Sequence, residues 1–169
     1  GVQFHPEVVH TPRGAEMLRN FVLGVCGASP NWDMGSFLEE EVLSIREKVG
    51  DDRVILGLSG GVDSTVVAAI MAQAIGTRCT CIFVDNGLLR YKEAEEVCAY
   101  FADWQDIEFV HIAAEDRFLS ELAGVDDPEK KRKIIGRVFV EVFEDASKSV
   151  NDARWLGQGT LYPDVIESA

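Results

Sequence analysis

Residues 53–65 of this 169-residue chain read RVILGLSGGVDST, from Arg53 to Thr65. The apolar run at 54–58 is followed at once by a glycine loop and then by an apolar helical pattern. A short apolar run bounded by turn residues predicts a buried strand, and glycines allow the backbone to turn sharply into a helix. A strand, a glycine loop and a helix in this order are typical of the anion-binding turn of an α/β fold.

The same alternation continues along the chain. Apolar runs predict strands at 79–84 and 107–112 and the start of a fourth at 155–156, with helices at 36–49, 64–75, 92–103, 115–123 and 127–150. Ser36 with Glu39 and Asp127 with Pro128 are typical helix starts. Near-continuous apolar strands between helices predict a doubly wound parallel sheet of the α/β class. The loops after residues 58, 84 and 156 then share the carboxyl edge, where such sheets bind ligands.

Loop-forming residues divide the chain near its beginning. A helical pattern at 14–25 is followed by Gly27, Ala28, Ser29, Pro30 and Asn31. We therefore expect a domain remnant at 1–27, a linker at 28–35 and the α/β domain at 36–169. The chain starts inside a strand-like run and stops inside a helix-like one, so both ends look cut and we expect a longer parent protein.

Composition limits the partners. With 29 acidic and 16 basic residues the net charge is -13, which disfavours nucleic acid as a partner. Neither a bilayer-spanning apolar run nor a signal peptide is present, so we expect a cytoplasmic protein that does not bind membranes. Cys79 and Cys81 alternate on an expected strand and are predicted to pack as small hydrophobic residues.

The glycine loop contains hydroxyls and an acid but no lysine. Ser59, Ser64 and Thr65 could donate to an anion, and Asp63 suits such a site if it helps to hold Mg²⁺. The loop fits neither the Walker nor the Rossmann fingerprint. A tight turn that needs glycine only for steric reasons is the alternative interpretation.

The segment SGGVDS resembles the pyrophosphate loop of the N-type ATP pyrophosphatases, which have an adenine nucleotide alpha hydrolase-like fold. These enzymes split ATP into AMP and pyrophosphate to adenylate a substrate oxygen. The resemblance implies that Mg²⁺ contacts Asp63 and that ATP is a co-substrate. It implies ATP binding by the residues Ser59, Gly60, Gly61, Val62, Asp63, Ser64, Thr65, Val84, Asp85, Gly159 and Thr160.

A second short motif lies at the start of the chain, where His5-Pro6-Glu7 places an imidazole and a carboxylate two residues apart. On an extended segment the carboxylate could orient the imidazole as a general base, although a surface histidine before a turn is the alternative. The motif resembles the end of the catalytic site of triad glutamine amidotransferases. The resemblance implies that His5 and Glu7 are catalytic and serve a cysteine upstream of Gly1, which Cys26 cannot replace.

An amidotransferase end followed by a pyrophosphatase domain resembles the GMP synthetase family, as do 84–90, 114–118, 127–137 and 158–168. The family makes GMP from xanthosine monophosphate, ATP and glutamine-derived ammonia through an adenylated intermediate. The resemblance implies that Arg132 contacts xanthosine monophosphate and that the parent is a homodimer through a further C-terminal domain. The basic run 130–133 could instead be a solvated helix face.

Two other functions stay open from the sequence alone. A tRNA-thiolating pyrophosphatase should have a basic surface and catalytic cysteines, and a non-catalytic module would bind ATP without reaction. We expect the chain by itself to bind ATP weakly and to lack glutaminase activity.

Overall fold

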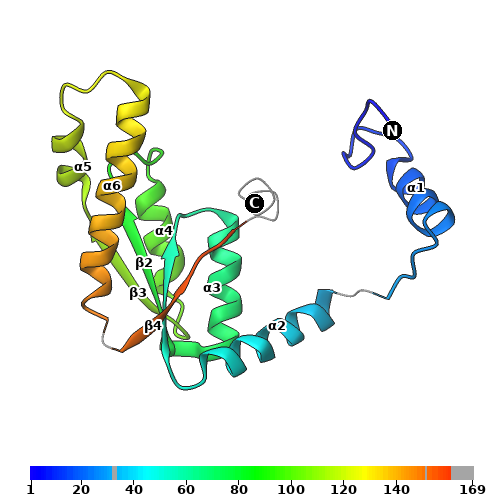
Figure 1. Ribbon diagram of the computed structural model, residues 1–169, viewed down its shortest axis with the longest axis horizontal. Coiled ribbons are helices and arrows are strands. Elements are labelled where there is room, and N and C mark those ends of the chain that lie inside the picture. The colour runs from blue at the N-terminus through cyan, green and yellow to red at the C-terminus, as the bar shows by residue number, and fades with distance from the viewer. Residues whose placement is uncertain (32–33, 151, 161–169) are drawn as a thin grey trace. The chain divides into compact units, whose positions relative to one another are not determined.

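The apolar runs form one parallel sheet in the structure, a computed structural model that describes residues 1–31, 34–150 and 152–160 (Figure 1). The strands are β1 (Arg53–Leu58), β2 (Cys79–Asp85), β3 (Glu108–Ala113) and β4 (Ala153–Gly157). They lie in the order β3-β2-β1-β4, and all three pairings are parallel. The predicted parallel α/β sheet is therefore confirmed, and the order reverses at β1, which has β2 on one side and β4 on the other.

Helices cover both faces of this sheet. The apolar residues separate into two clusters because successive strand residues point to opposite faces. Leu56 of β1 belongs to a cluster with α2 (Met34–Val49), α3 (Val62–Ile75) and α4 (Glu93–Ala102). Ile55 belongs to a second cluster with α5 (Glu115–Leu122) and α6 (Pro128–Ser147). The two central strands, β1 and β2, are thus buried on both sides, which explains their nearly continuous apolar sequences, whereas the edge strands β3 and β4 are more exposed.

The helix starts agree only in part with the sequence patterns. The Asp127 side chain accepts a hydrogen bond from the Lys130 amide at 2.8 Å, so the predicted cap of α6 is confirmed. The predicted start at Ser36 is wrong, because α2 begins at Met34 and includes Ser36 in its first turn. Met34 and Gly35 have no barrier to helical backbone, and capping patterns locate a helix end only to within a residue or two.

The chain divides into two compact units, Gly1–Phe37 and Leu38–Ala169. In the first, α1 (Gly14–Arg19) continues as the π-helical segment η1 (Asn20–Val25). The strand-like run expected at the N-terminus instead forms bends and turns. Gly14, at the start of α1, lies so close to this segment that a Cβ at residue 14 would overlap the Pro6 carbonyl. The domain limits expected from the sequence stay a prediction.

The two cysteines of β2 belong to the hydrophobic core. Cys79 and Cys81 are fully buried with their sulfur atoms 4.0 Å apart, so the predicted packing of these residues is confirmed.

Within the described ranges, no helix has both the length and the apolar character needed to cross a bilayer.

Candidate nucleotide site at the carboxyl edge of the sheet

The glycine loop joins the end of β1 to the start of α3. Gly60 has φ 76, a left-handed conformation that glycine adopts without steric cost. Gly61 is the N-cap of α3, and no side chain caps this helix end by a hydrogen bond. The first-turn amides therefore have no capping side chain and lie at the positive end of the helix, an arrangement that suits an anion.

The hydroxyls of the loop bond to the loop itself. Ser64 is buried, and its Oγ donates to the Gly61 carbonyl at 3.1 Å and accepts from the Ser59 amide at 3.2 Å. The Gly61 amide donates to Ser59 Oγ at 3.3 Å, and Thr65 Oγ1 donates to the Gly61 carbonyl at 2.9 Å. These bonds fix the turn, and donation by the hydroxyls to a phosphate stays a prediction.

Asp63 lies exposed in the first turn of α3. Among the described residues there is no group of three or more His, Cys, Asp or Glu side chains that could hold a metal ion. A hard cation such as Mg²⁺ takes oxygen ligands, often one or two carboxylates completed by water and phosphate oxygens. One carboxylate beside an anion site fits this pattern.

The loop after β2 is ordered by its own side chains. Asp85 Oδ1 accepts from the Gly87 amide at 3.0 Å, and Asn86 Oδ1 accepts from the Leu88 amide at 2.9 Å. Gly87 has φ 70 and lies against Glu115 at the start of α5. The Val84 side chain is buried, so only its backbone can meet a ligand.

The loop after β4 approaches the glycine loop. A Cβ at Gly159 would lie 3.6 Å from both the Asp63 carbonyl carbon and the Ser64 amide nitrogen. Thr160 follows and is exposed. The structure thus brings Gly159 to the first turn of α3, at the place where the strand order reverses and doubly wound sheets form their ligand crevice.

Arg132 lies in the exposed first turns of α6, with Lys130, Lys131 and Lys133 also exposed. It forms an ion pair with Glu129 at 2.8 Å, and no contact with the glycine loop is recorded for it in the described part of the chain. The helix starts on the side of the sheet toward which the strand arrows point (Figure 1). The basic run therefore faces solvent in this structure, and its substrate contact stays a prediction.

The short motif of the first unit forms one hydrogen bond. His5 Nδ1 and Glu7 Oε1 are 2.7 Å apart, with 79% and 59% of their side chains exposed. A backbone hydrogen bond at Glu7 and the bond from His5 lower the pKa of the Glu7 carboxyl. Thr11 Oγ1 donates to the His5 carbonyl at 2.6 Å, while Cys26 lies exposed at the end of η1. The imidazole is thus bonded to the carboxylate, and its role as a general base stays a prediction.

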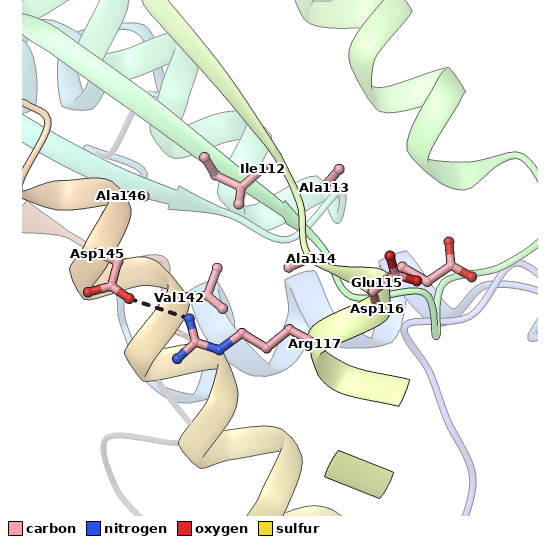
Figure 2. A pocket seen from close by; sticks show the side chains of 9 residues that line it. All are labelled: Ile112, Ala113, Ala114, Glu115, Asp116, Arg117, Val142, Asp145 and Ala146. Atoms are coloured by element: carbon pink, nitrogen blue, oxygen red, sulfur yellow. Dashed lines mark hydrogen bonds and ion pairs between the residues drawn. The ribbon is translucent and has the colours of Figure 1, made fainter. Parts of the chain in front are cut away.

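Two pockets were not expected from the sequence. One, of about 560 Å³, lies between the start of α5 and α6, and Figure 2 shows Arg117 reaching across it to Asp145 at 3.4 Å. The other, of about 550 Å³, lies beside the glycine loop between α3 and α4. Its lining includes Tyr91 and Tyr100, and no spacing in the sequence marks these aromatic residues as neighbours of the loop.

Comparisons with known proteins separate the two parts of the chain. The family model for NAD synthase matches residues 33–121, more than half of the chain, and that for class-I glutamine amidotransferase matches residues 1–25. The glutamine-hydrolysing GMP synthases of Yersinia pseudotuberculosis serotype O:3 (strain YPIII) and Sodalis glossinidius (strain morsitans) are 59% and 60% identical over all 169 residues. The chain spans 32% of each, about a third of the length of the curated relatives.

Solved structures show the same fold at low identity. The ammonia-dependent NAD synthetase of Campylobacter jejuni, solved with nitrate, has a TM-score of 0.65 and 19% identity, over 81% of this chain and 61% of that one. The glutamine-dependent NAD⁺ synthetase of Acinetobacter baumannii, solved with ADP, has a TM-score of 0.62 and 21% identity, over 84% and 29%. At these identities the likeness concerns the fold alone.

Proposed function

The chain belongs to the NAD synthase family, which has the N-type ATP pyrophosphatase fold, and on this premise we propose that its parent protein makes GMP. The chain matches glutamine-hydrolysing GMP synthases over its whole length. The substrates proposed are xanthosine monophosphate, ATP and glutamine-derived ammonia. The observation that carries this proposal is the 59% identity over 169 residues, because the matched region covers both the His5 motif and the glycine loop.

The proposed reaction has two steps. The C2 oxygen of xanthosine monophosphate attacks the α-phosphorus of ATP, the bond from that phosphorus to the bridging oxygen breaks, and pyrophosphate leaves. Ammonia then attacks C2, and AMP leaves with the oxygen. Two proteins of the same fold were solved with nitrate and with ADP, which are ligands of the kinds that this proposal places at the glycine loop.

In this proposal the loops at the carboxyl edge of the sheet bind ATP. The first-turn amides of α3, with Gly60 and Gly61, hold the leaving pyrophosphate. The backbone at Val84 and Asp85 meets the adenine. Gly159 and Thr160 bound the crevice on the other side. These roles follow from preorganised donors at the place where charge develops on the leaving group.

Mg²⁺ fits beside this loop, because Asp63 offers a carboxylate where the phosphates supply further oxygens; when bound, the ion neutralises charge on the pyrophosphate. Arg132, in the exposed basic run, is proposed to contact xanthosine monophosphate. His5 and Glu7 are proposed as the general base and its orienting partner for a glutaminase cysteine in the parent. Cytoplasmic location, a homodimeric parent and the absence of nucleic acid as partner remain part of this proposal.

A test compares Asp63→Ala with Asp51→Ala, an exposed aspartate that precedes β1 at the opposite edge of the sheet. Binding of ATP to the chain is measured by calorimetry with Mg²⁺ and then with EDTA. We expect Asp63→Ala and EDTA each to weaken binding at least tenfold, about 1.4 kcal/mol, while Asp51→Ala binds like wild type. Unchanged Mg²⁺-dependent binding by Asp63→Ala would contradict the metal assignment, and no ATP binding by the wild type would contradict the site.

NAD synthesis is the second candidate, since the matching family model and both solved relatives carry that name. The two activities use the same adenylation chemistry and differ in the acceptor. The far higher identity to GMP synthases favours xanthosine monophosphate as acceptor. Formation of AMP by the parent enzyme with xanthosine monophosphate, and not with the NAD precursor acid, distinguishes them.

A further inference from the structure

One face of α4 packs against the glycine loop. Glu93, Val97 and Phe101 follow at intervals of four residues and therefore lie on one side of the helix. All three line the 550 Å³ pocket together with Gly60 and Gly61. The helix that follows β2 thus forms a wall against the loop that follows β1.

The contact with Gly60 is close. A Cβ at residue 60 would lie 3.0 Å from Val97 Cγ2, 3.7 Å from Glu93 Oε1 and 4.0 Å from Phe83 Cε2. Val97 and Phe83 are both buried, so neither can move away without disturbing the core. Gly60 is therefore confined by α4 and by β2.

Glu93 connects this contact to the loop after β2. Its Oε2 accepts a hydrogen bond from the Arg90 amide at 2.8 Å, which holds the end of that loop to the first turn of α4. Its other oxygen, Oε1, faces Gly60. A single side chain thus bonds to the loop after β2 and lies beside Gly60 of the glycine loop, and the proposed function assigns both loops to ATP.

We propose that Val97 and Glu93 are positioning residues, which set the place of Gly60 and hence the direction of the amides that hold pyrophosphate. This inference rests on the proposed function. In this proposal neither residue binds the phosphates directly, and each acts through the loop. Misplacement of a binding group by about 1 Å can lower the rate of an enzyme reaction by up to about a hundredfold. A small shift of Gly60 is therefore sufficient to impair the binding of pyrophosphate.

The first experiment compares Val97→Ala with Val49→Ala. Val49 is also buried in the cluster that contains Val97, but it ends α2 before β1 begins, at the amino edge of the sheet. The dissociation constant of the 169-residue chain for inorganic pyrophosphate with Mg²⁺ is measured by calorimetry, and folding by thermal unfolding. We expect a lower Tm for both variants. Only Val97→Ala should raise Kd, by about tenfold or more, which corresponds to about 1.4 kcal/mol of binding free energy.

A second set tests the mechanism. Gly60→Ala raises Kd, and adding Val97→Ala to it raises Kd by less than the product of the two single effects, because the opposing methyl group is then gone. Glu93→Gln keeps an oxygen acceptor for the Arg90 amide and binds like wild type, whereas Glu93→Ala binds more weakly.

The outcomes separate the two proposals. Equal Kd values for Val97→Ala and Val49→Ala, or fully multiplicative effects in the double variant, would overturn the inference and leave the proposed function intact. A wild-type chain that binds neither pyrophosphate nor ATP would overturn the proposed function, and the positioning role with it.

Discussion

Replacing Gly87 by alanine should destabilise the α/β unit through two separable effects. Gly87 has φ 70, and a left-handed conformation costs a residue with a Cβ about 1–2 kcal/mol. The new Cβ would also overlap Glu115 Cγ and lie 3.0 Å from Glu115 Cβ, and overpacking of this kind costs about 1–3 kcal/mol. Together these effects predict a loss of roughly 2–5 kcal/mol in the free energy of unfolding.

Urea unfolding followed by tryptophan fluorescence measures this loss, and the chain supplies a matched control. Gly124 has φ 73 but no atom within 4 Å of its would-be Cβ, so Gly124→Ala carries only the conformational cost. Adding Glu115→Ala to Gly87→Ala removes the overlap with Cγ and should recover part of the difference. If Gly87→Ala costs no more than Gly124→Ala, the close packing of this loop against α5 is refuted.

Two further predictions concern the core and the first unit. Phe118 of α5 is fully buried in the cluster that α5 and α6 form with the sheet. Phe118→Ala should therefore lower the free energy of unfolding by about 3–5 kcal/mol in the same urea assay. A loss below about 1 kcal/mol would contradict its core position. The pKa of Glu7 lies below its usual value, so the His5–Glu7 bond should persist above that folded pKa and be lost as the pH falls through it. Carbon-13 NMR titration of the Glu7 carboxyl checks this, and a pKa at or above the ordinary value would contradict the hydrogen bond.

The sheet was predictable because its two central strands, β1 and β2, are buried on both faces. Residues such as Val54, Ile55 and Leu56 form an unbroken apolar run only when each face has a covering helix layer. The order of the strands was harder to predict from the sequence, since it depends on the face of the sheet to which each connecting helix crosses. The start of α2 was missed because Met34 and Gly35 contain no signal that separates the last loop residue from the first helical one.

The candidate site was predictable where backbone geometry requires a particular residue. Gly60 is required by its left-handed φ, so its place in the loop is visible in the sequence. The internal bonding of Ser59 and Ser64 was not visible, because a hydroxyl can donate to a ligand or to a nearby carbonyl and the residue type is the same. Arg132 has the same ambiguity, since an exposed arginine can pair with a neighbouring carboxylate such as Glu129 or with a substrate anion, and the residue type is the same.

Val97 illustrates a different limit. In the sequence it is one apolar position of an amphipathic helix, and every such position predicts core packing. The structure shows that this core position is also the surface against which Gly60 rests. The hydroxyls of Ser59, Ser64 and Thr65 fix the turn from within the loop. They do not set where Gly60 lies relative to β2 and α4, so that part of the loop's placement must come from the elements that pack around it. The residues that tune such a site are therefore expected among buried apolar positions on the neighbouring helix, where a binding motif gives no indication of them.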